Sequence, residues 1–159
     1  MRVFKEEQKF NQWWLKLLLG VLLIGTGLAL YQSYKIGNEI GKTALGFGII
    51  LLVSLFFLVA QLRTKIDQHG ITATFFPTTF FTKSYSWAEV EKVYVRKYSA
   101  ITEYGGWGVR GFFNAKAYNT SGEMGIQIIS KKGERFLIGT QKPNEAKKVI
   151  TRYLKNSEI

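Results

Sequence analysis

The sequence lacks cysteine altogether and has only one histidine and one aspartate among its 159 residues. Without cysteine there can be no disulfide, no thiolate zinc site, no iron–sulfur cluster and no cysteine nucleophile. A single histidine and a single aspartate also leave too few groups for most metal sites and catalytic triads. We therefore expect no metal, no cofactor and no catalytic residue, and we class the chain as a non-enzyme.

Acidic residues are scarce overall, since 22 Lys and Arg stand against 11 Asp and Glu, a formal net charge of +11. The chain is nevertheless 47% hydrophobic and 15% aromatic, which excludes a disordered basic tail. The longest apolar runs lie before residue 62. This uneven distribution divides the chain into an apolar first part and a basic second part.

Two apolar runs are long enough to cross a bilayer. Between Trp13 and Tyr31 the only charge is Lys16, near one end, where its ammonium group can reach the headgroups. An α-helix of this length spans about 28 Å, close to the thickness of the hydrocarbon core. Aromatic residues flank the run as in an interfacial belt. The second run, Thr43–Ala60, has no charge.

The two runs predict a transmembrane helical hairpin, and we expect this hairpin to offer a surface for homo-oligomerisation. We assign residues 13–31 and 43–62 to the membrane, 32–42 to a connector and 1–12 to a cytoplasmic tail. A cleaved signal peptide is the alternative for the first run, but the polar connector leads directly into another span. Lys and Arg are more frequent outside the connector, so both termini are expected in the cytoplasm.

Residues 63–159 form the predicted soluble domain, with 16 Lys and Arg against 8 Asp and Glu from Gln61 onward. Alternating β-branched and aromatic residues, separated by turn residues, predict antiparallel strands. About seven strands are expected, at residues 63–68, 71–76, 80–86, 92–98, 108–118, 124–130 and 134–139. After Pro143 the apolar spacing becomes helical, which predicts a C-terminal helix covering an open β barrel or sandwich.

Two local patterns suggest chemistry and are set aside. Gly106–Gly111 reads G-x-G-x-x-G, but a dinucleotide fingerprint needs a helix after it, and a strand is expected here. Asp67 and His69 resemble an acid/base pair, but neighbours within one turn seldom converge on a substrate. A strand bend and an ordinary turn are the better interpretations.

The basic surplus of the β domain is the remaining functional signal. Anionic lipid at the cytoplasmic leaflet attracts each nearby Lys or Arg by about 1 kcal/mol. Trp107 and Arg110 are predicted to project from the glycine-rich segment. The full set of candidate lipid or partner contacts is Trp107, Arg110, Arg96, Lys116, Lys131, Lys132 and Arg135. No nucleic-acid-binding motif is present, so nucleic acid is not an expected partner.

Several segments together resemble a known architecture: Ile66-Asp67, Gly70-Ile71, Trp87-Ala88-Glu89-Val90, Gly105-Gly106-Trp107-Gly108-Val109-Arg110, Ala117-Tyr118-Asn119 and Ile138-Gly139-Thr140-Gln141-Lys142-Pro143. With two preceding spans, they resemble bacterial membrane proteins that carry a pleckstrin-homology-like (PH-like) domain. The resemblance covers the whole chain. It implies two orthogonal sheets closed by a C-terminal helix, and it carries over no catalytic residue and no phosphoinositide site.

The expected class is thus an α+β protein of the bacterial inner membrane, with a helical hairpin as anchor and a PH-like antiparallel domain in the cytoplasm. The expected function is a binding or scaffolding module for a protein partner or anionic lipid. An accessory or regulatory subunit of a membrane transporter complex is the alternative.

Overall fold

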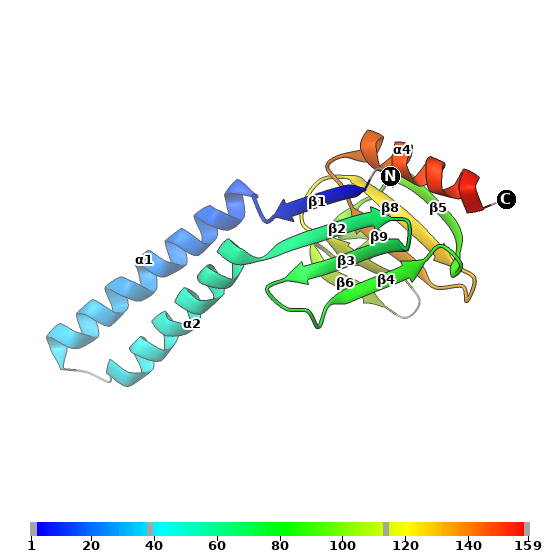
Figure 1. The fold of residues 1–159 in the computed structure, drawn as a ribbon. Helices are drawn as coiled ribbons and strands as arrows, with labels where there is room; N and C mark the ends of the chain where they lie inside the picture. The colour runs from blue at the N-terminus through cyan, green and yellow to red at the C-terminus, as the bar shows by residue number, and fades with distance from the viewer. Residues whose placement is uncertain (1–2, 38–39, 113–114, 158–159) are drawn as a thin grey trace. The chain divides into compact units, whose positions relative to one another are not determined.

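The computed structural model describes residues 3–37, 40–112 and 115–157, and the chain divides into two compact units (Figure 1). One unit is helical and comprises Phe10–Ala60. The other is the β domain, which joins the residues before Phe10 to the whole chain from Gln61 onward. Each unit is described by itself below.

The helical unit is a hairpin of two long helices, α1 (Trp13–Ile36) and α2 (Ile40–Val59). Both are long and apolar enough to cross a membrane. They pack through a narrow stripe in which Gly27 leaves room for Phe47: a Cβ at Gly27 would lie 3.6 Å from the Phe47 ring.

The hairpin connection is shorter than predicted, because α1 continues through residues 32–36. Gly37 ends α1 in a left-handed conformation, φ 72°, and its N–H bonds to the Ser33 carbonyl. The polar side chains of that last turn marked it as connector in the sequence. Polarity alone does not end a helix, however, and a left-handed glycine commonly does.

The first sheet of the β domain contains four antiparallel strands in the order β1-β2-β3-β4. Their bounds are Phe4–Lys9, Gln61–Asp67, Gly70–Phe76 and Thr82–Ser86. The predicted tail over residues 1–12 therefore contains a strand. Its inward positions are Phe4, Glu6 and Gln8. Two of these three residues are polar, which hides the usual hydrophobic alternation of a strand.

The second sheet contains five strands in the order β5-β8-β9-β7-β6. Their bounds are Val90–Lys97 (β5), Gly108–Phe112 (β6), Ala115–Asn119 (β7), Met124–Ser130 (β8) and Arg135–Gly139 (β9). The predicted single strand over 108–118 is two strands of a hairpin, and β7 pairs with β9 in parallel. The described strands thus number nine rather than seven, and they form two open sheets rather than a closed barrel.

The two sheets face each other across an aromatic core. The Phe75 ring of the first sheet lies 5.7 Å from the Tyr118 ring of the second, and Tyr85 lies 5.7 Å from Phe136. Phe136 also contacts Tyr118 edge to face at 4.9 Å. Such aromatic pairs contribute beyond the apolar area that they bury. The inward residues of both sheets therefore form one continuous core.

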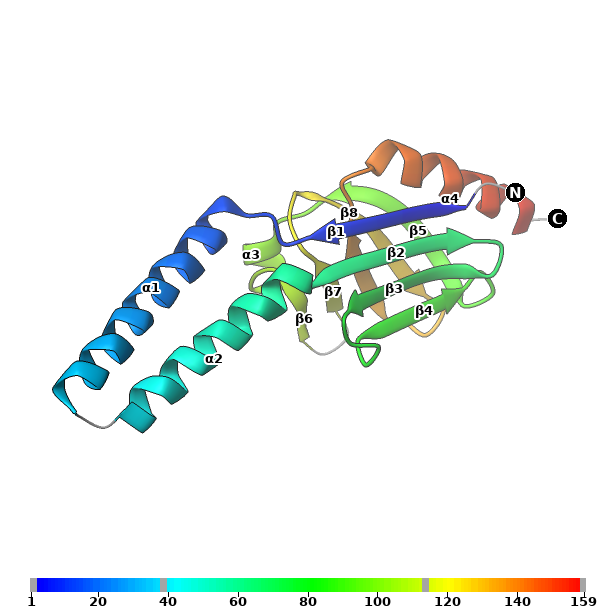
Figure 2. The same ribbon diagram turned by 60° about the vertical axis from the view of Figure 1, so that its left-hand side comes forward.

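Two helices complete the β domain. The short α3 (Ala100–Tyr104) follows β5 and was not predicted. The predicted C-terminal helix is present as α4 (Pro143–Ser157), which lies across the domain beside β1 and β5 (Figure 2). It buries Ala146 and Ile150, and the Tyr153 ring stacks on Trp87 at 5.3 Å.

Candidate binding surface

The helical unit is inserted between two strands that pair directly with each other. β1 and β2 are antiparallel neighbours, and Lys9 is the register partner of Gln61. Gln61 in turn pairs with Phe76 at the end of β3. We call the end of the β domain marked by this row of three residues the attachment end, and the opposite end the distal end.

Buried polar contacts tie β1 to the second sheet at the attachment end. The Gln8 side-chain amide donates to the Gly139 carbonyl at 2.6 Å, and Thr120 Oγ1 donates to Gln8 Oε1 at 3.2 Å. The Glu6 carboxylate accepts from Thr140 Oγ1 and from the Gln141 amide, each at 2.7 Å. These contacts place the end of β9 beside β1, so both sheets share one attachment end.

The predicted contact residues do not form one surface. Arg96 pairs in register with Gly125, which pairs with Gly139, so Arg96 lies in the row at the attachment end. Arg135 begins β9, four residues before Gly139, or about 14 Å away along the strand. Three candidates lie at or toward the attachment end: Arg96, Trp107 and Arg110. Lys131, Lys132 and Arg135 lie at the distal end, and Lys116 lies one register row from Arg110, on the row of Phe136.

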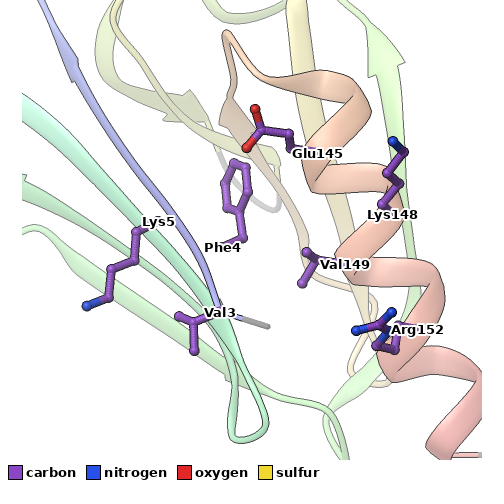
Figure 3. A pocket seen from close by; sticks show the side chains of 7 residues that line it. All are labelled: Val3, Phe4, Lys5, Glu145, Lys148, Val149 and Arg152. Atoms are coloured by element: carbon purple, nitrogen blue, oxygen red, sulfur yellow. The ribbon is translucent and has the colours of Figure 1, made fainter. Parts of the chain in front are cut away.

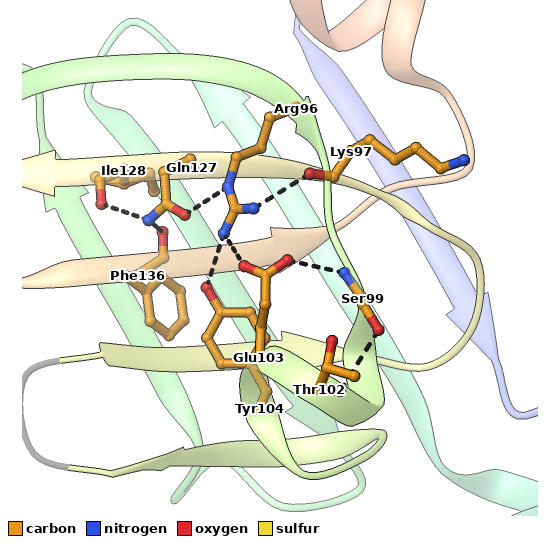
Figure 4. A network of polar contacts seen from close by, with 9 residues as sticks. All are labelled: Arg96, Lys97, Ser99, Thr102, Glu103, Tyr104, Gln127, Ile128 and Phe136. Atoms are coloured by element: carbon orange, nitrogen blue, oxygen red, sulfur yellow. Dashed lines mark hydrogen bonds and ion pairs between the residues drawn. The ribbon is translucent and has the colours of Figure 1, made fainter.

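Arg96 is engaged within the protein (Figure 4). Its guanidinium donates to Glu103 Oε2 at 2.7 Å, to the Tyr104 hydroxyl at 3.2 Å and to Gln127 Oε1 at 3.0 Å. It also donates to the backbone carbonyl of Lys97 at 3.1 Å. A guanidinium with this set of acceptors fixes α3 against β5 and β8. Arg96 therefore has a structural role within the β domain.

The same network changes the pKa values of Glu103 and Arg96. The hydrogen bond from Arg96 lowers the pKa of Glu103 below its usual 4.5, and the Ser99 amide, at 2.9 Å from Glu103 Oε1, adds to the effect. Conversely, the bond to Glu103 raises the pKa of Arg96. Ser99 also caps α3, because its side chain accepts from the Thr102 amide.

Trp107 does not project freely as predicted. It is partly buried and packs against an apolar cluster below the glycine-rich segment. The members of that cluster are Tyr98, Ala100, Tyr104, Ala117 and Leu137. The Trp107 carbonyl accepts from Arg110 Nε at 2.8 Å. The segment continues into β6, which begins at Gly108 inside the G-x-G-x-x-G pattern, and the next described element is the strand β7.

The distal candidates have a different character. Lys131 and Lys132 form the turn between β8 and β9, and Lys116 and Arg135 lie on the adjacent strand ends. All four are exposed. Within the described part of the chain, none of them takes part in an ion pair. Lys116 is the register partner of Phe136, which faces the core, so Lys116 and Arg135 project from opposite faces of the sheet. We therefore call Lys131, Lys132 and Arg135 the distal basic cluster. Lys132 is close enough to Glu89 to contribute to the lowered pKa of that carboxyl, and the charges of Lys131 and Arg135 are available to an external anion.

A groove runs between β1 and α4 (Figure 3). Its volume is about 470 Å³, and Val3, Phe4 and Val149 contribute apolar surface to it. Arg152 reaches from α4 toward β1, whereas the Lys5 side chain points away from the helix (Figure 3). The remaining lining residues are Glu145 and Lys148. The floor of the groove is thus largely apolar, and more cations than anions border it.

Asp67 and His69 act as turn residues. Asp67 Oδ1 accepts from the His69 amide at 2.8 Å, and Oδ2 pairs with Lys65 at 2.6 Å. The Lys65 bond is the main reason that the pKa of Asp67 is lowered. Among the residues that the structure describes, no three acidic or histidine side chains gather as metal ligands would.

No protein-family model matches the chain, and no curated protein matches it. The sequence did not point to the β1–α4 groove, because β1 was not expected as a strand. A signal was present in the alternation of Phe4, Glu6 and Gln8 with exposed residues, but it was too polar to stand out.

Proposed function

We propose that this chain is a non-enzymatic, two-span protein of the bacterial inner membrane whose PH-like β domain binds an acidic segment of a protein partner at the cytoplasmic face. One observation carries the proposal: the apolar hairpin is inserted between the paired strands β1 and β2. Because β1 and β2 belong to one sheet, a chain that crosses the membrane through α1 returns through α2. Such an insertion holds the domain to the membrane by two covalent connections.

The helices have the properties of membrane spans. At 1.5 Å per residue, the 24 residues of α1 and the 20 of α2 span about 36 and 30 Å. The hydroxyl of Thr26 donates to the Leu22 carbonyl at 2.7 Å, and that of Ser54 to the Ile50 carbonyl at 2.8 Å. Internal bonding of this kind lets polar side chains lie in hydrocarbon. Leu17, Leu28 and many other apolar side chains are exposed.

The architecture of the β domain supports the PH-like assignment. Two sheets face each other over a common core, and a C-terminal helix lies across them. Folds of this kind serve many binding functions, so the assignment defines a scaffold and the surface must define the ligand.

The distal basic cluster favours a protein partner over lipid of the protein's own membrane. It lies about 14 Å or more along the strands from the attachment end. At physiological salt, screening limits the electrostatic interaction between exposed charges to a range of about 8 Å. These cations therefore approach the anionic leaflet only if the domain lies flat on it. An acidic segment of another protein can reach them in any orientation.

A charge-reversal experiment in neutral-lipid nanodiscs tests the proposal. The full-length chain is titrated with a fluorescent polyglutamate peptide over a salt series. The Lys131→Glu/Lys132→Glu variant should lose at least tenfold in affinity. The control, Lys142→Glu/Lys147→Glu, makes the same change in net charge away from the cluster and should lose less than threefold. Equal losses in both variants would show attraction to net charge alone and would contradict a site at the cluster.

A further inference from the structure

The turn between β3 and β4 exposes aromatic surface to solvent. Residues 74–82 read Thr-Phe-Phe-Pro-Thr-Thr-Phe-Phe-Thr and contain no charge. The Phe80 side chain is 92% exposed, Phe81 46% and Phe76 38%. Soluble domains rarely present three phenylalanines to water so close together. A contiguous exposed apolar patch of this kind marks an interaction site.

This turn lies at the attachment end. Phe76 is the register partner of Gln61, and Gln61 comes two residues after Val59, the last residue of α2. Two residues span at most about 7 Å, and adjacent strands are about 4.8 Å apart. Chain connectivity and strand register thus keep the Phe76 backbone within about 12 Å of the end of α2. This limit does not depend on the tilt of the β domain.

The turn is held in shape by its own hydrogen bonds. The Phe75 amide donates to the Phe81 carbonyl at 3.1 Å, and Thr82 Oγ1 donates to the Thr79 carbonyl at 2.9 Å. Thr78 Oγ1 donates to the Phe75 carbonyl at 3.4 Å. Backbone groups satisfied in this way need less water when the turn enters an apolar medium.

Basic residues border the aromatic turn on the same sheet. The Arg63 guanidinium carbon lies 4.4 Å from the centre of the Phe76 ring, a cation–π contact. Lys9 occupies the same row two strands away. Aromatic rings beside Arg and Lys are typical of segments that sit at the headgroup level of a bilayer.

We infer that the β3–β4 turn is a third membrane contact, in which Phe80 and Phe81 insert into the interfacial layer of the membrane that α1 and α2 cross. The inference rests on the proposed function. A bilayer is the occupant that the geometry favours, since the backbone of Phe76, where the turn begins, lies within about 12 Å of the end of α2. We call the inserted pair Phe80 and Phe81 the wedge. With the two covalent connections and the wedge, the β domain has three points of attachment to the membrane and a restricted orientation.

The absence of cysteine permits a clean test by site-specific labelling of the full-length chain in nanodiscs. A polarity-sensitive dye is attached at Thr79→Cys, beside Phe80, and lipids carrying a nitroxide near the headgroups quench it on contact. His69→Cys, in the β2–β3 turn at the distal end, is the matched control. Leu52→Cys, on the exposed face of α2, reports on membrane insertion of the helix, with lipids that carry the nitroxide within the acyl chain as its quencher.

We expect the dye at position 79 to be quenched at least threefold more than the dye at position 69. Adding Phe80→Ser and Phe81→Ser should reduce the quenching at 79 to the level at 69. Quenching at 52 with equal, weak quenching at 79 and 69 would overturn the wedge and leave the spans intact. No quenching at 52 would overturn the spans and the wedge together. A dye at 79 shielded from aqueous iodide but not quenched by lipid would indicate a protein contact, which also overturns the wedge.

Discussion

Lys9 and Gln61 are register partners in adjacent antiparallel strands, although the whole helical unit Phe10–Ala60 separates them in the chain. The sheet therefore closes the hairpin at its open end. This relationship makes β1 part of the β domain rather than a leader to α1. The stability of the domain should accordingly depend on residues that precede the first helix.

Glu6 provides the first test of that dependence. Its side chain is 4% exposed and accepts two hydrogen bonds at 2.7 Å, from Thr140 and Gln141. Glu6→Ala leaves those donors without their partner and should lower the free energy of unfolding by about 1–3 kcal/mol. Glu7→Ala, one residue away on the exposed side, should change it by less than about 0.5 kcal/mol.

Denaturant unfolding of the full chain in detergent micelles, followed by tryptophan fluorescence, measures both variants. Equal midpoints for Glu6→Ala and the unmodified chain would show that β1 is not integral to the β domain.

Gly139 provides a packing test at the same end. A Cβ at this position would lie 3.0 Å from Asn119 Cβ and 3.2 Å from the Tyr98 hydroxyl. Gly139→Ala should therefore destabilise the β domain by about 1–3 kcal/mol, because Asn119 on β7 and Tyr98, just after β5, must move. Gly20→Ala is the control, since a Cβ there meets nothing within 4 Å. An unchanged melting temperature for Gly139→Ala would contradict the close approach of these strands.

The Arg96–Glu103 pair predicts a local response to acid. Arg96 lowers the pKa of Glu103 below 4.5, so the folded state favours the carboxylate more than the unfolded state does. Its contribution is complete above about pH 4.5 and is lost as the pH falls through the lowered folded value. The Ser99 amide resonance should therefore move with Glu103 in an acid NMR titration. In Glu103→Gln that movement should vanish; its persistence would assign the transition to another group.

Two buried tyrosines predict a response to alkali. Burial raises the pKa of Tyr85 and of Tyr98 to about 12, from the usual 10.0. The unfolded chain ionises these phenols first, so stability should fall as the pH rises from about 10 toward 12. Tyr98→Phe should make that decline shallower. Ultraviolet titration of tyrosinate should show late-ionising phenols in the folded chain, and ionisation of every tyrosine near pH 10 would contradict the burial.

The predictable parts of the fold are those with a strong periodic signal. The apolar runs predicted α1 and α2, and the helical spacing after Pro143 predicted α4, because one physical requirement sets each pattern. The strand β1 was not predicted, because its inward residues Glu6 and Gln8 are polar and are buried with hydrogen-bond partners. The division of residues 108–118 into β6 and β7 was missed because neither a Gly-rich nor a Pro-containing turn dipeptide separates the two strands. Strand register, which divides the candidate cations between two ends, depends on long-range pairing that local patterns do not contain.

The candidate surface was predictable only in part. The sequence indicated the distal pair Lys131 and Lys132 correctly as turn residues. It did not indicate that Arg96 is committed to Glu103 and Gln127, or that Trp107 packs on Tyr98 and its neighbours, because these contacts join segments that are distant in the chain or meet only after folding.

The most direct test of the central claim is cysteine accessibility in membranes. Single cysteines are placed at Lys5 in β1, at Ile36 at the end of α1 and at Glu91 in β5, and vesicles of known orientation are treated with an impermeant maleimide. A two-span hairpin inserted between β1 and β2 predicts that positions 5 and 91 react from the cytoplasmic side only, and position 36 from the opposite side only. Reaction of position 36 from the same side as positions 5 and 91 would contradict the claim that α1 and α2 cross the membrane.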